Sequence, residues 1–375
     1  MIRPATLMDL DRLVTIEDAC FTTDRLSRRS FRHLLTKGNA ATLVEEVGGQ
    51  IRGYVMLLFS NYTSLARLYS LAVDPGYQHK GVGLLLVEAA EQSALERECV
   101  SMRLEIRQDN SASIQLFQKM GYKQFDLIPG YYEDQMAALR FEKSLAHHLR
   151  LDQVHVPYYE QTLDFTCGPS ALMMAMKAVD SSVTLNRTLE LRLWRESTTI
   201  FMTAGHGGCG PFGLALSAYH RGFEVDVYVN EKGPFLVDSV RGQDKKEVVR
   251  LVHEDFLNEI NTNHINVRNG ALSVSELEES FASGGIPIVL ISSYRIYHEK
   301  SPHWVVVTGV DERFIYVHDS SVDYEEGKSA WDCMNMPIHK KEFERMARYG
   351  KAAQKAAIVV RAKARHGPQG LESTI

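Results

Sequence analysis

The chain has 375 residues, which at about 150 residues per domain predicts two or three domains. Its 42 lysines and arginines against 47 aspartates and glutamates give a net charge of −5, which argues against a strongly basic nucleic-acid-binding protein. No apolar run approaches the roughly 20 residues that cross a bilayer, and residues 1–6 show no secretory signal. Five scattered cysteines favour a reducing compartment. We therefore expect a cytoplasmic protein that binds neither membrane nor nucleic acid.

Strand-like and helix-like patterns alternate over residues 1–143. Two apolar runs, 41–46 and 51–59, flank a Gly-Gly pair and predict a β-hairpin. Apolar residues at helical spacing predict a helix over 83–97. The other predicted elements are strands at 68–73, 102–106, 122–127 and 135–141 and a helix at 111–120. This alternation predicts an α/β domain.

A glycine-rich turn follows the strand predicted at 68–73 and opens the helix predicted at 83–97. Its residues are Gln78, His79, Lys80, Gly81, Val82 and Gly83. Glycines let a backbone approach a ligand closely, and the N–H groups at a helix start favour phosphate. Taken alone, the pattern is equally compatible with an ordinary tight turn.

Other motifs before and after the turn favour the ligand-binding interpretation. Val73-x-Pro75 precedes Gln78-x-x-Gly81-x-Gly83, and Asn110-x-Ala112 precedes Leu116-Phe117 and Gly121-Tyr122. The pattern resembles the GNAT acyl-CoA N-acyltransferases over about residues 1–142. The resemblance implies acetyl-CoA as acyl donor, with residues 78–83 on its pyrophosphate. It also implies that the pantetheine arm pairs with the strand and that two further side chains contact the cofactor; these residues are Leu71, Ala72, Val73, Asn110 and Phe117.

The motif Ile16-Glu17-x-x-Cys20-Phe21, together with Leu104-Glu105 and Tyr131-Tyr132, resembles the branch that acetylates ribosomal-protein N-termini. The resemblance implies that Glu105 is the base that deprotonates the acceptor ammonium. Phe117 stands where relatives carry a tyrosine acid, and phenylalanine has no proton to donate. Either the thiolate leaves unassisted, since a thiol pKa is only about 8.5, or one of the two tyrosines substitutes. The two tyrosines are equally compatible with a role in shaping the substrate channel.

The polar segment 144–152 predicts a linker to a second α/β domain at 153–362, followed by a flexible tail at 363–375. The second domain is predicted to contain helices at 166–179, 212–220 and 274–282 and strands at 224–229, 286–292, 304–309 and 314–318.

Two Cys-Gly-Pro triplets, at Cys167 and Cys209, each precede a predicted helix. A helix N-terminus lowers the pKa of a thiol, so position alone does not choose between them. Gln161, six residues before Cys167, has the spacing of an oxyanion donor beside a nucleophilic cysteine. His303 begins one predicted strand and Asp319 closes the next, so antiparallel pairing would bring a base and its orienting group together. These neighbours favour Cys167 as the nucleophile.

The ordered pattern of Gln161, Cys167-Gly168-Pro169-Ser170, His303-Trp304 and Asp319 resembles the C39 family of papain-like cysteine peptidases, which trim leader peptides after a double glycine. The resemblance implies Cys167 as nucleophile, His303 as base, Asp319 as its orienting group and Gln161 as oxyanion donor. Relatives often carry proline after the aspartate, where this chain has Ser320. They are usually fused to an ABC transporter, for which this chain shows no membrane segments or ATP-binding motif.

His206 and Cys209 form at most half a metal site, and no second pair with metal-ligand spacing occurs, so we expect no metal. The predicted fold class is α/β (α+β), a GNAT mixed-sheet domain followed by a papain-like cysteine peptidase domain. The predicted function is bifunctional: acetyl transfer to a peptide or protein amine, at an N-terminus or lysine, plus thiol peptidase activity. Alternatively, the second domain binds a peptide without cutting it. Neighbouring genes for a precursor peptide or a peptide ligase would favour peptide maturation.

Overall fold

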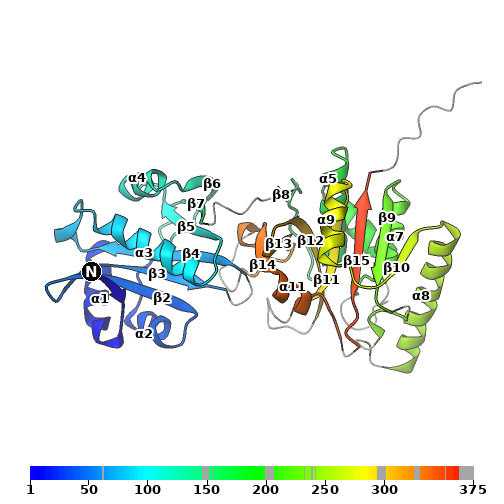
Figure 1. Cartoon of the computed structure of the whole chain (residues 1–375), viewed down its shortest axis with the longest axis horizontal. Helices are drawn as coiled ribbons and strands as arrows, with labels where there is room; N and C mark the ends of the chain where they lie inside the picture. The colour runs from blue at the N-terminus through cyan, green and yellow to red at the C-terminus, as the bar shows by residue number, and fades with distance from the viewer. Residues whose placement is uncertain are drawn as a thin grey trace, which may run out of the picture. The chain divides into compact units, whose positions relative to one another are not determined.

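The computed structural model describes residues 1–60, 63–145, 152–153, 155–198, 207–231, 233–237, 240, 242–293, 301–324, 330–350 and 352–362. The chain forms two compact units, Met1–Arg150 (the first unit) and Leu151–Ile375 (the second unit), shown in Figure 1. The expected tail at 363–375 and most of the expected linker lie outside the described residues.

The sheet of the first unit has, in its described residues, seven strands in the spatial order β1-β2-β3-β4-β5-β7-β6. Neighbouring strands are antiparallel except β4 and β5, which are parallel. The strands are β1 (Ile2–Pro4), β2 (Ala40–Val47), β3 (Gln50–Phe59), β4 (Leu65–Val73), β5 (Ser101–Arg107), β6 (Lys123–Ile128) and β7 (Ala138–Ser144). The predicted hairpin is confirmed: β2 and β3 are joined through Gly48 and Gly49, whose φ angles of 58° and 77° suit glycine.

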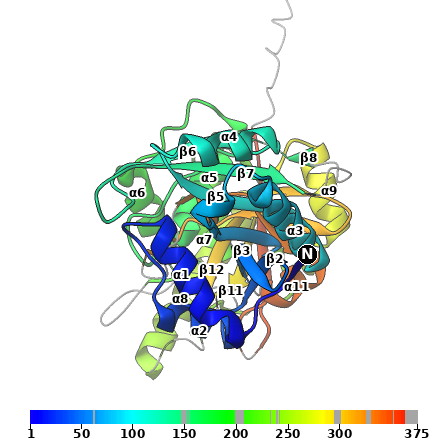
Figure 2. The same ribbon diagram turned by 90° about the vertical axis from the view of Figure 1, so that its left-hand side faces the viewer.

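Helices cover both faces of this sheet, as Figure 2 shows. The helices are α1 (Leu10–Cys20), α2 (Arg28–Thr36), α3 (Val82–Glu96) and α4 (Ser111–Lys119), with short 3-10 turns η1 (Leu7–Asp9) and η2 (Pro75–Tyr77). α1 and α2 pack against one face, and α3 packs against the other. Leu86, Val87 and Ala90 of α3 are fully buried, because their helical spacing places them on one stripe.

β4 and β5 pair over only four residues, from Leu65 opposite Ser101 to Leu68 opposite Leu104. Beyond this point β4 continues beside β3, and β5 continues beside β7. Tyr69 is an extra residue in β4 relative to β3, and such a bulge bends a strand and increases its twist. The two parallel strands therefore separate, and we call the opening between them the wedge.

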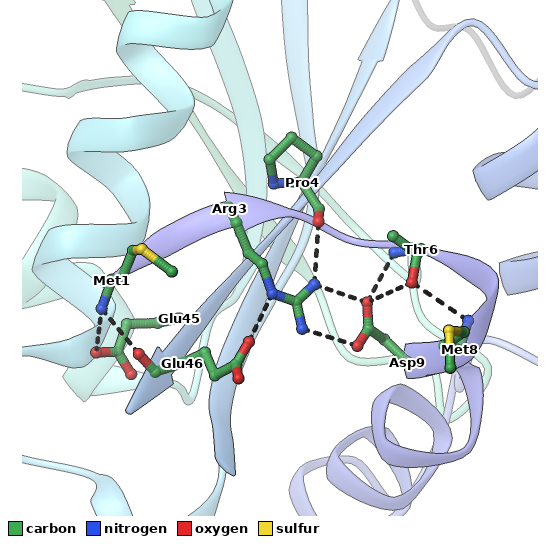
Figure 3. A network of polar contacts seen from close by, with 8 residues as sticks. All are labelled: Met1, Arg3, Pro4, Thr6, Met8, Asp9, Glu45 and Glu46. Carbon is green, nitrogen blue, oxygen red and sulfur yellow. Dashed lines mark hydrogen bonds and ion pairs between the residues drawn. The ribbon is translucent and has the colours of Figure 1, made fainter. Parts of the chain in front are cut away.

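A charged network ties the N-terminal strand to the sheet edge (Figure 3). The Arg3 guanidinium donates to Glu46 at 2.6 Å and to both carboxylate oxygens of Asp9 at 2.9 Å. Asp9 also accepts from the backbone N–H of Thr6 at 2.7 Å, which completes a capping box at the start of η1. The hydrogen bond from Arg3 lowers the pKa of Asp9 to about 2.

The second unit contains a mixed sheet in the order β10-β9-β15-β11-β12-β13-β14, with β8 beside β12. Only β9 and β10 pair in parallel among its described strands. The strands are β8 (Asp152–Gln153), β9 (Glu224–Val229), β10 (Asn266–Asn269), β11 (Ile286–Ser292), β12 (Pro302–Val310), β13 (Phe314–His318), β14 (Met336–His339) and β15 (Ala356–Arg361). β12 lies inside the sheet: its start, at Pro302 and His303, pairs with β11, and its pairing with β13 begins at Val306.

Helices also cover both faces of this second sheet. They are α5 (Cys167–Val179), α6 (Arg187–Ser197), α7 (Pro211–Tyr219), α8 (Gln243–Thr262), α9 (Val274–Ala282) and α11 (Lys340–Met346), with the turn η4 (Ala330–Cys333). α5 and α7 bury apolar side chains in one core, while Leu277 of α9 and Phe343 of α11 belong to the core on the other face. The α5 segment is fully buried from Ala171 to Met176.

Most predicted elements are present with shifted ends. The strand predicted at 135–141 begins instead at Ala138, because Gln135 has a left-handed φ of 66° that a strand does not accommodate. α8 was not predicted, since only Val249, His253 and Ile260 of its 20 residues are buried and the apolar pattern is weak. No helix in the described part of the chain has the length and apolar character needed to cross a membrane.

Candidate active sites

A cavity of about 790 Å³ occupies the wedge of the first unit. Its walls include residues 67–71 of β4, residues 104–107 of β5 and residues 20–26, which begin at the last residue of α1. Four of the residues predicted to bind the cofactor or act as base line it, Leu71, Glu105, Asn110 and Phe117, and so do both candidate acids, Tyr131 and Tyr132. Ala72, Val73 and the turn at 78–83 are not among its lining residues. The predicted cofactor residues thus fall in three places: the cavity lining, the end of β4 at Ala72 and Val73, and the turn at 78–83.

Glu105 is held between two arginines. Its Oε2 accepts from Arg67 Nε at 3.0 Å, and its Oε1 accepts from Arg140 Nε at 3.1 Å. Sequence reasoning missed both arginines, although Arg140 lies directly opposite Glu105 in the β5–β7 register. Arg67 also donates to the hydroxyl oxygen of Tyr131 at 2.8 Å, which connects that ring to the carboxylate. Burial raises the pKa of Tyr131, so its hydroxyl keeps its proton at neutral pH.

The glycine-rich turn starts α3 with Gly81 as its N-cap, at a left-handed φ of 81°. The first helical hydrogen bond runs from Leu85 N–H to Gly81 O, so the preceding N–H groups, of Val82, Gly83 and Leu84, have no carbonyl partner within the helix. Before the helix, Gln78 Nε2 donates to Val73 O at 3.1 Å and Lys80 Nζ donates to Gly76 O at 2.8 Å. His79 is exposed and also has a left-handed φ, of 60°. This geometry presents several donors at one positive helix end, which suits a phosphate.

Two further lining residues belong to α4. Asn110 is its N-cap, and the Asn110 Oδ1 accepts from Ser113 N–H at 3.1 Å. Phe117 is buried and packs edge-to-face on Tyr122 at 5.1 Å between ring centroids. Burial raises the pKa of Tyr122, and its hydroxyl donates to the sulfur of Met102 at 3.1 Å. Tyr122 therefore does not serve as the proton donor that Phe117 cannot be, because its hydroxyl is directed at Met102.

A second carboxylate, Glu17, lines the cavity and was not predicted as a site residue. It accepts from Leu26 N–H at 2.7 Å and from the hydroxyl of Tyr54, which is also bonded to Ser70 Oγ at 2.8 Å. Burial raises the pKa of Glu17. The sequence feature that could have identified Glu17 is its place next to Ile16, on the face of α1 that is buried.

In the second unit, Cys167 is the first residue of α5. Gly168 lets this helix end pack closely: a Cβ there would lie 3.2 Å from Leu214 Cδ1 and from Trp304 Cδ1. The indole of Trp304 donates to Cys209 O at 3.0 Å. The glycine of the Cys-Gly-Pro triplet thus allows close packing, which places the start of α5 against β12.

His303 and Asp319 meet because β12 and β13 are antiparallel neighbours. His303 Nε2 lies 2.6 Å from Asp319 Oδ1, and both residues are buried. The thiol of Cys167 is hydrogen-bonded to the His303 ring and to the backbone N–H of Trp304. With Nε2 engaged by Asp319, the ring nitrogen that remains for the thiol is Nδ1.

The charges of this group favour an ion pair. Burial by itself would raise the pKa of Cys167, but the charge of His303 and the hydrogen bonds from His303 and Trp304 lower it overall. Burial alone would lower the pKa of His303, but Asp319 and then Cys167 raise it well above its ordinary value. The arrangement therefore favours a thiolate beside an imidazolium.

Gln161 lies on the loop that precedes α5. Its Oε1 accepts from Ser320 Oγ at 2.9 Å, its Nε2 donates to Leu163 O at 3.0 Å, and its backbone N–H donates to Ser320 O at 2.9 Å. Sequence reasoning noted Ser320 only as a departure from relatives. The structure brings it against the proposed oxyanion donor.

The fully buried carboxylate of Glu190 holds the rest of this loop. It accepts from Thr162 N–H at 2.8 Å, from Tyr159 Oη at 2.9 Å, and from the hydroxyls of Thr162 and Thr166. Sequence reasoning missed Glu190, which belongs to α6 and carries no local motif.

The competing cysteine has a different environment. Cys209 is 4% exposed, and burial raises the pKa of its thiol. A buried neutral thiol is a poor nucleophile. The surroundings of Cys167 and Cys209 therefore distinguish the two cysteines, whereas their identical Cys-Gly-Pro triplets did not. His206, the other half of the metal pair considered above, lies outside the described residues. Within the described residues no group of three or more His, Cys, Asp or Glu side chains is arranged to hold a metal ion.

Two family models match this chain, at different residues. The model of the Acetyltransferase (GNAT) family matches residues 10–122. The model of the Peptidase_C39 like family matches residues 156–361, more than half of the chain. An N-alpha-acetyltransferase of Sulfurisphaera tokodaii is 31% identical over 144 residues, covering 36% of this chain and 86% of that protein.

Two more matches fall on the first unit. An acetyltransferase of Pectobacterium atrosepticum is 34% identical over 86 residues, which cover 23% of this chain and 60% of that protein. The crystal structure of the ribosomal-protein-S18-alanine N-acetyltransferase from Escherichia coli shares 22% identity, with a TM-score of 0.36, over 39% of this chain and 93% of that one. The resemblances stated from the motifs are confirmed: this chain belongs to the GNAT acetyltransferase family through its first unit and to the Peptidase_C39 like family through its second.

Proposed function

We propose that this acetyltransferase is a bifunctional enzyme of peptides or proteins. Its first unit transfers acetyl from acetyl-CoA to an N-terminal or lysine amine, and its second unit is a thiol peptidase of the leader-processing type. The observation that carries the peptidase half is the hydrogen-bonded series of Cys167, His303 and Asp319, whose charges favour a thiolate. The observation that carries the transferase half is the wedge cavity beside the start of α3.

The residues around the wedge fit an acyl-CoA. A cavity of about 790 Å³ accommodates an extended arm, and the edge of β4 at Leu71, which lines this cavity, would pair with it. The N–H groups of the first turn of α3 would hold a pyrophosphate. When bound, the cofactor supplies an activated acetyl thioester.

Two residues of the chain have proposed roles in proton transfer. Oε2 of Glu105 has a second lone pair besides the one that Arg67 engages, so it can accept a proton from the acceptor ammonium. Tyr131 receives a hydrogen bond from Arg67, which leaves its own proton for the departing sulfur. We propose this tyrosine in place of the acid that Phe117 does not supply.

In the second unit we propose that the Cys167 thiolate attacks the scissile carbonyl carbon. The oxyanion accepts hydrogen bonds from the Cys167 backbone N–H and from Gln161 Nε2. The His303 imidazolium gives its proton to the departing amine and then takes one from the water that hydrolyses the thioester. Asp319 keeps the ring oriented throughout.

The test uses the full chain with acetyl-CoA and a peptide that contains a double glycine, read by mass spectrometry. The wild type is expected to give a cleaved product and an acetylated product. Cys167→Ala should abolish cleavage and leave acetylation, and Glu105→Ala should do the reverse. Acetylation of the amine newly released by cleavage would support a shared substrate, whereas acetylation of uncut peptide alone would contradict it.

The alternative, in which the second unit holds a peptide without cutting it, gives a different result. Iodoacetamide should label Cys167 selectively in an enzyme, and His303→Ala should suppress that labelling. Labelling that is indifferent to His303→Ala would favour the non-cleaving module.

A further inference from the structure

We propose that Ser320 is a positioning residue of the peptidase, which orients the side-chain amide of Gln161 as an oxyanion donor. This inference rests on the proposed peptidase function and assigns a role to a residue outside the group of Cys167, His303 and Asp319.

The orientation of the Gln161 amide follows from its two partners. The carbonyl oxygen of Leu163 only accepts hydrogen bonds, so the amide nitrogen must face it, at 3.0 Å. The amide oxygen then faces Ser320, whose hydroxyl donates to it at 2.9 Å. One proton of Nε2 is used by Leu163, and the other remains for a substrate oxyanion.

Ser320 holds Gln161 at two points. Its carbonyl oxygen accepts from the backbone N–H of Gln161 at 2.9 Å, and its hydroxyl binds the amide. Ser320 has no exposed surface, so water does not compete for this hydroxyl. The preceding residue, Asp319, binds His303 at 2.6 Å. Two consecutive residues therefore hold the base and the oxyanion donor in a fixed relation.

The hydroxyl can be removed with little effect on the loop. Glu190 holds the loop through Tyr159, Thr162 and Thr166 and makes no described contact with the amide of Gln161. The backbone bond from Gln161 N–H to Ser320 O does not involve a side chain. In Ser320→Ala the loop should stay in place while the amide becomes free to rotate.

The experiment measures hydrolysis of a quenched double-glycine peptide by the full chain and by Ser320→Ala, Gln161→Ala and the double variant. Removing an oxyanion donor costs about 10²–10³ in kcat, and we expect that for Gln161→Ala. Ser320→Ala should lower kcat about 10-fold with KM nearly unchanged, a loss smaller than that range. If Ser320 acts through Gln161, the double variant should be no slower than Gln161→Ala.

Three controls separate positioning from general damage. The pH profile of Cys167 labelling by iodoacetamide should be unchanged in Ser320→Ala, because the ion pair with His303 does not involve this hydroxyl. Ser217→Ala removes another buried hydroxyl, which is bonded to Ser197 at 2.8 Å, and should leave hydrolysis unchanged. If Ser320→Ala does not fold, Ser320→Thr keeps the donor and should retain activity.

Additive losses in the double variant, a shifted labelling profile, or full activity in Ser320→Ala would each overturn the inference. A wild type that neither cleaves the peptide nor labels at Cys167 would instead overturn the proposed peptidase function, and the inference with it.

Discussion

The ionisation of Cys167 is set by two side chains that lie more than a hundred residues later in the sequence. Because His303 lowers the pKa of this thiol, the thiolate should persist below the ordinary thiol pKa of 9.0. We predict that iodoacetamide labels Cys167 rapidly at neutral pH and that His303→Ala moves the inflection of the rate upward, because burial then raises the pKa of the thiol without the opposing charge. Mass spectrometry of the Cys167 peptide measures both profiles.

Cys209 provides the internal control, since burial raises the pKa of its thiol. It should stay unlabelled over the range in which Cys167 reacts. Equal rates at both cysteines, or an unchanged profile in His303→Ala, would contradict the ion pair.

The sequence predicts some contacts of single residues and not others. His303 and Asp319 could be placed together because neighbouring antiparallel strands bring the start of one beside the end of the next. Arg140 could be placed opposite Glu105 only once β7 was known to lie beside β5. Glu190 reaches Thr166 from a helix that begins only at Arg187, and no periodicity links the two. Polar contacts between residues far apart in the sequence depend on how helices and strands pack, and a local sequence pattern does not predict that packing.

At the scale of elements, the start of α3 depends on a backbone conformation. Gly81 has a φ of 81°, which costs other residues about 1–2 kcal/mol, whereas Gly83 lies inside the helix. Gly81→Ala should lower the free energy of unfolding by about 1–2 kcal/mol and weaken acetyl-CoA binding. Urea denaturation and calorimetry measure the two effects.

Gly83→Ala is the matched comparison. Its Cβ would lie 3.4 Å from Leu116 Cδ2, an ordinary contact, and alanine favours a helix over glycine by about 1 kcal/mol. The variant should therefore be at least as stable as the wild type. Equal destabilisation by both substitutions would show that the left-handed angle is not what matters at Gly81.

The network that joins β1 to η1 should respond to acid. Because Arg3 lowers the pKa of Asp9 from 3.8 to about 2, its stabilising contribution is complete above pH 4 and is lost as the pH falls toward 2. Asp9→Asn should remove about 1–2 kcal/mol of stability at neutral pH and less at pH 2. Unfolding by urea at both pH values measures the difference, and an equal loss at both would contradict the role of charge.

Several elements were not predicted from the sequence, and for the longest of them, α8, the cause is simple. α8 exposes most of its surface, so few apolar residues mark its period. β9 and β11, in contrast, were predicted with the ends they have, because short apolar strands bounded by polar residues leave a clear pattern. Their spatial order was not predictable, since β15 enters between them from the end of the described chain.

At the scale of the whole molecule, each unit buries its own apolar clusters: Leu86 and Tyr54 belong to those of the first unit, and Met174 and Val307 to those of the second. We therefore predict two transitions in a calorimetric scan. Acetyl-CoA at 100 times its Kd should stabilise the first unit by about 2.7 kcal/mol and raise only one transition.

Cys167→Ala, which leaves the cofactor residues intact, should show the same shift with acetyl-CoA. Gly81→Ala should show a smaller one. A single transition that moves as a whole would contradict independent cores.

The parallel strands of the first unit separate after four paired residues, which leaves one side of β4 beyond Leu68 without a neighbouring strand among the described residues. A free strand edge is ordinarily a template on which other chains stack and aggregate. Here residues of β5 and of the segment 20–26 wall the edge inside a cavity of about 790 Å³. A strand from another chain would have to displace these walls to pair with β4, so we expect this edge to resist the edge-to-edge pairing that leads to aggregation.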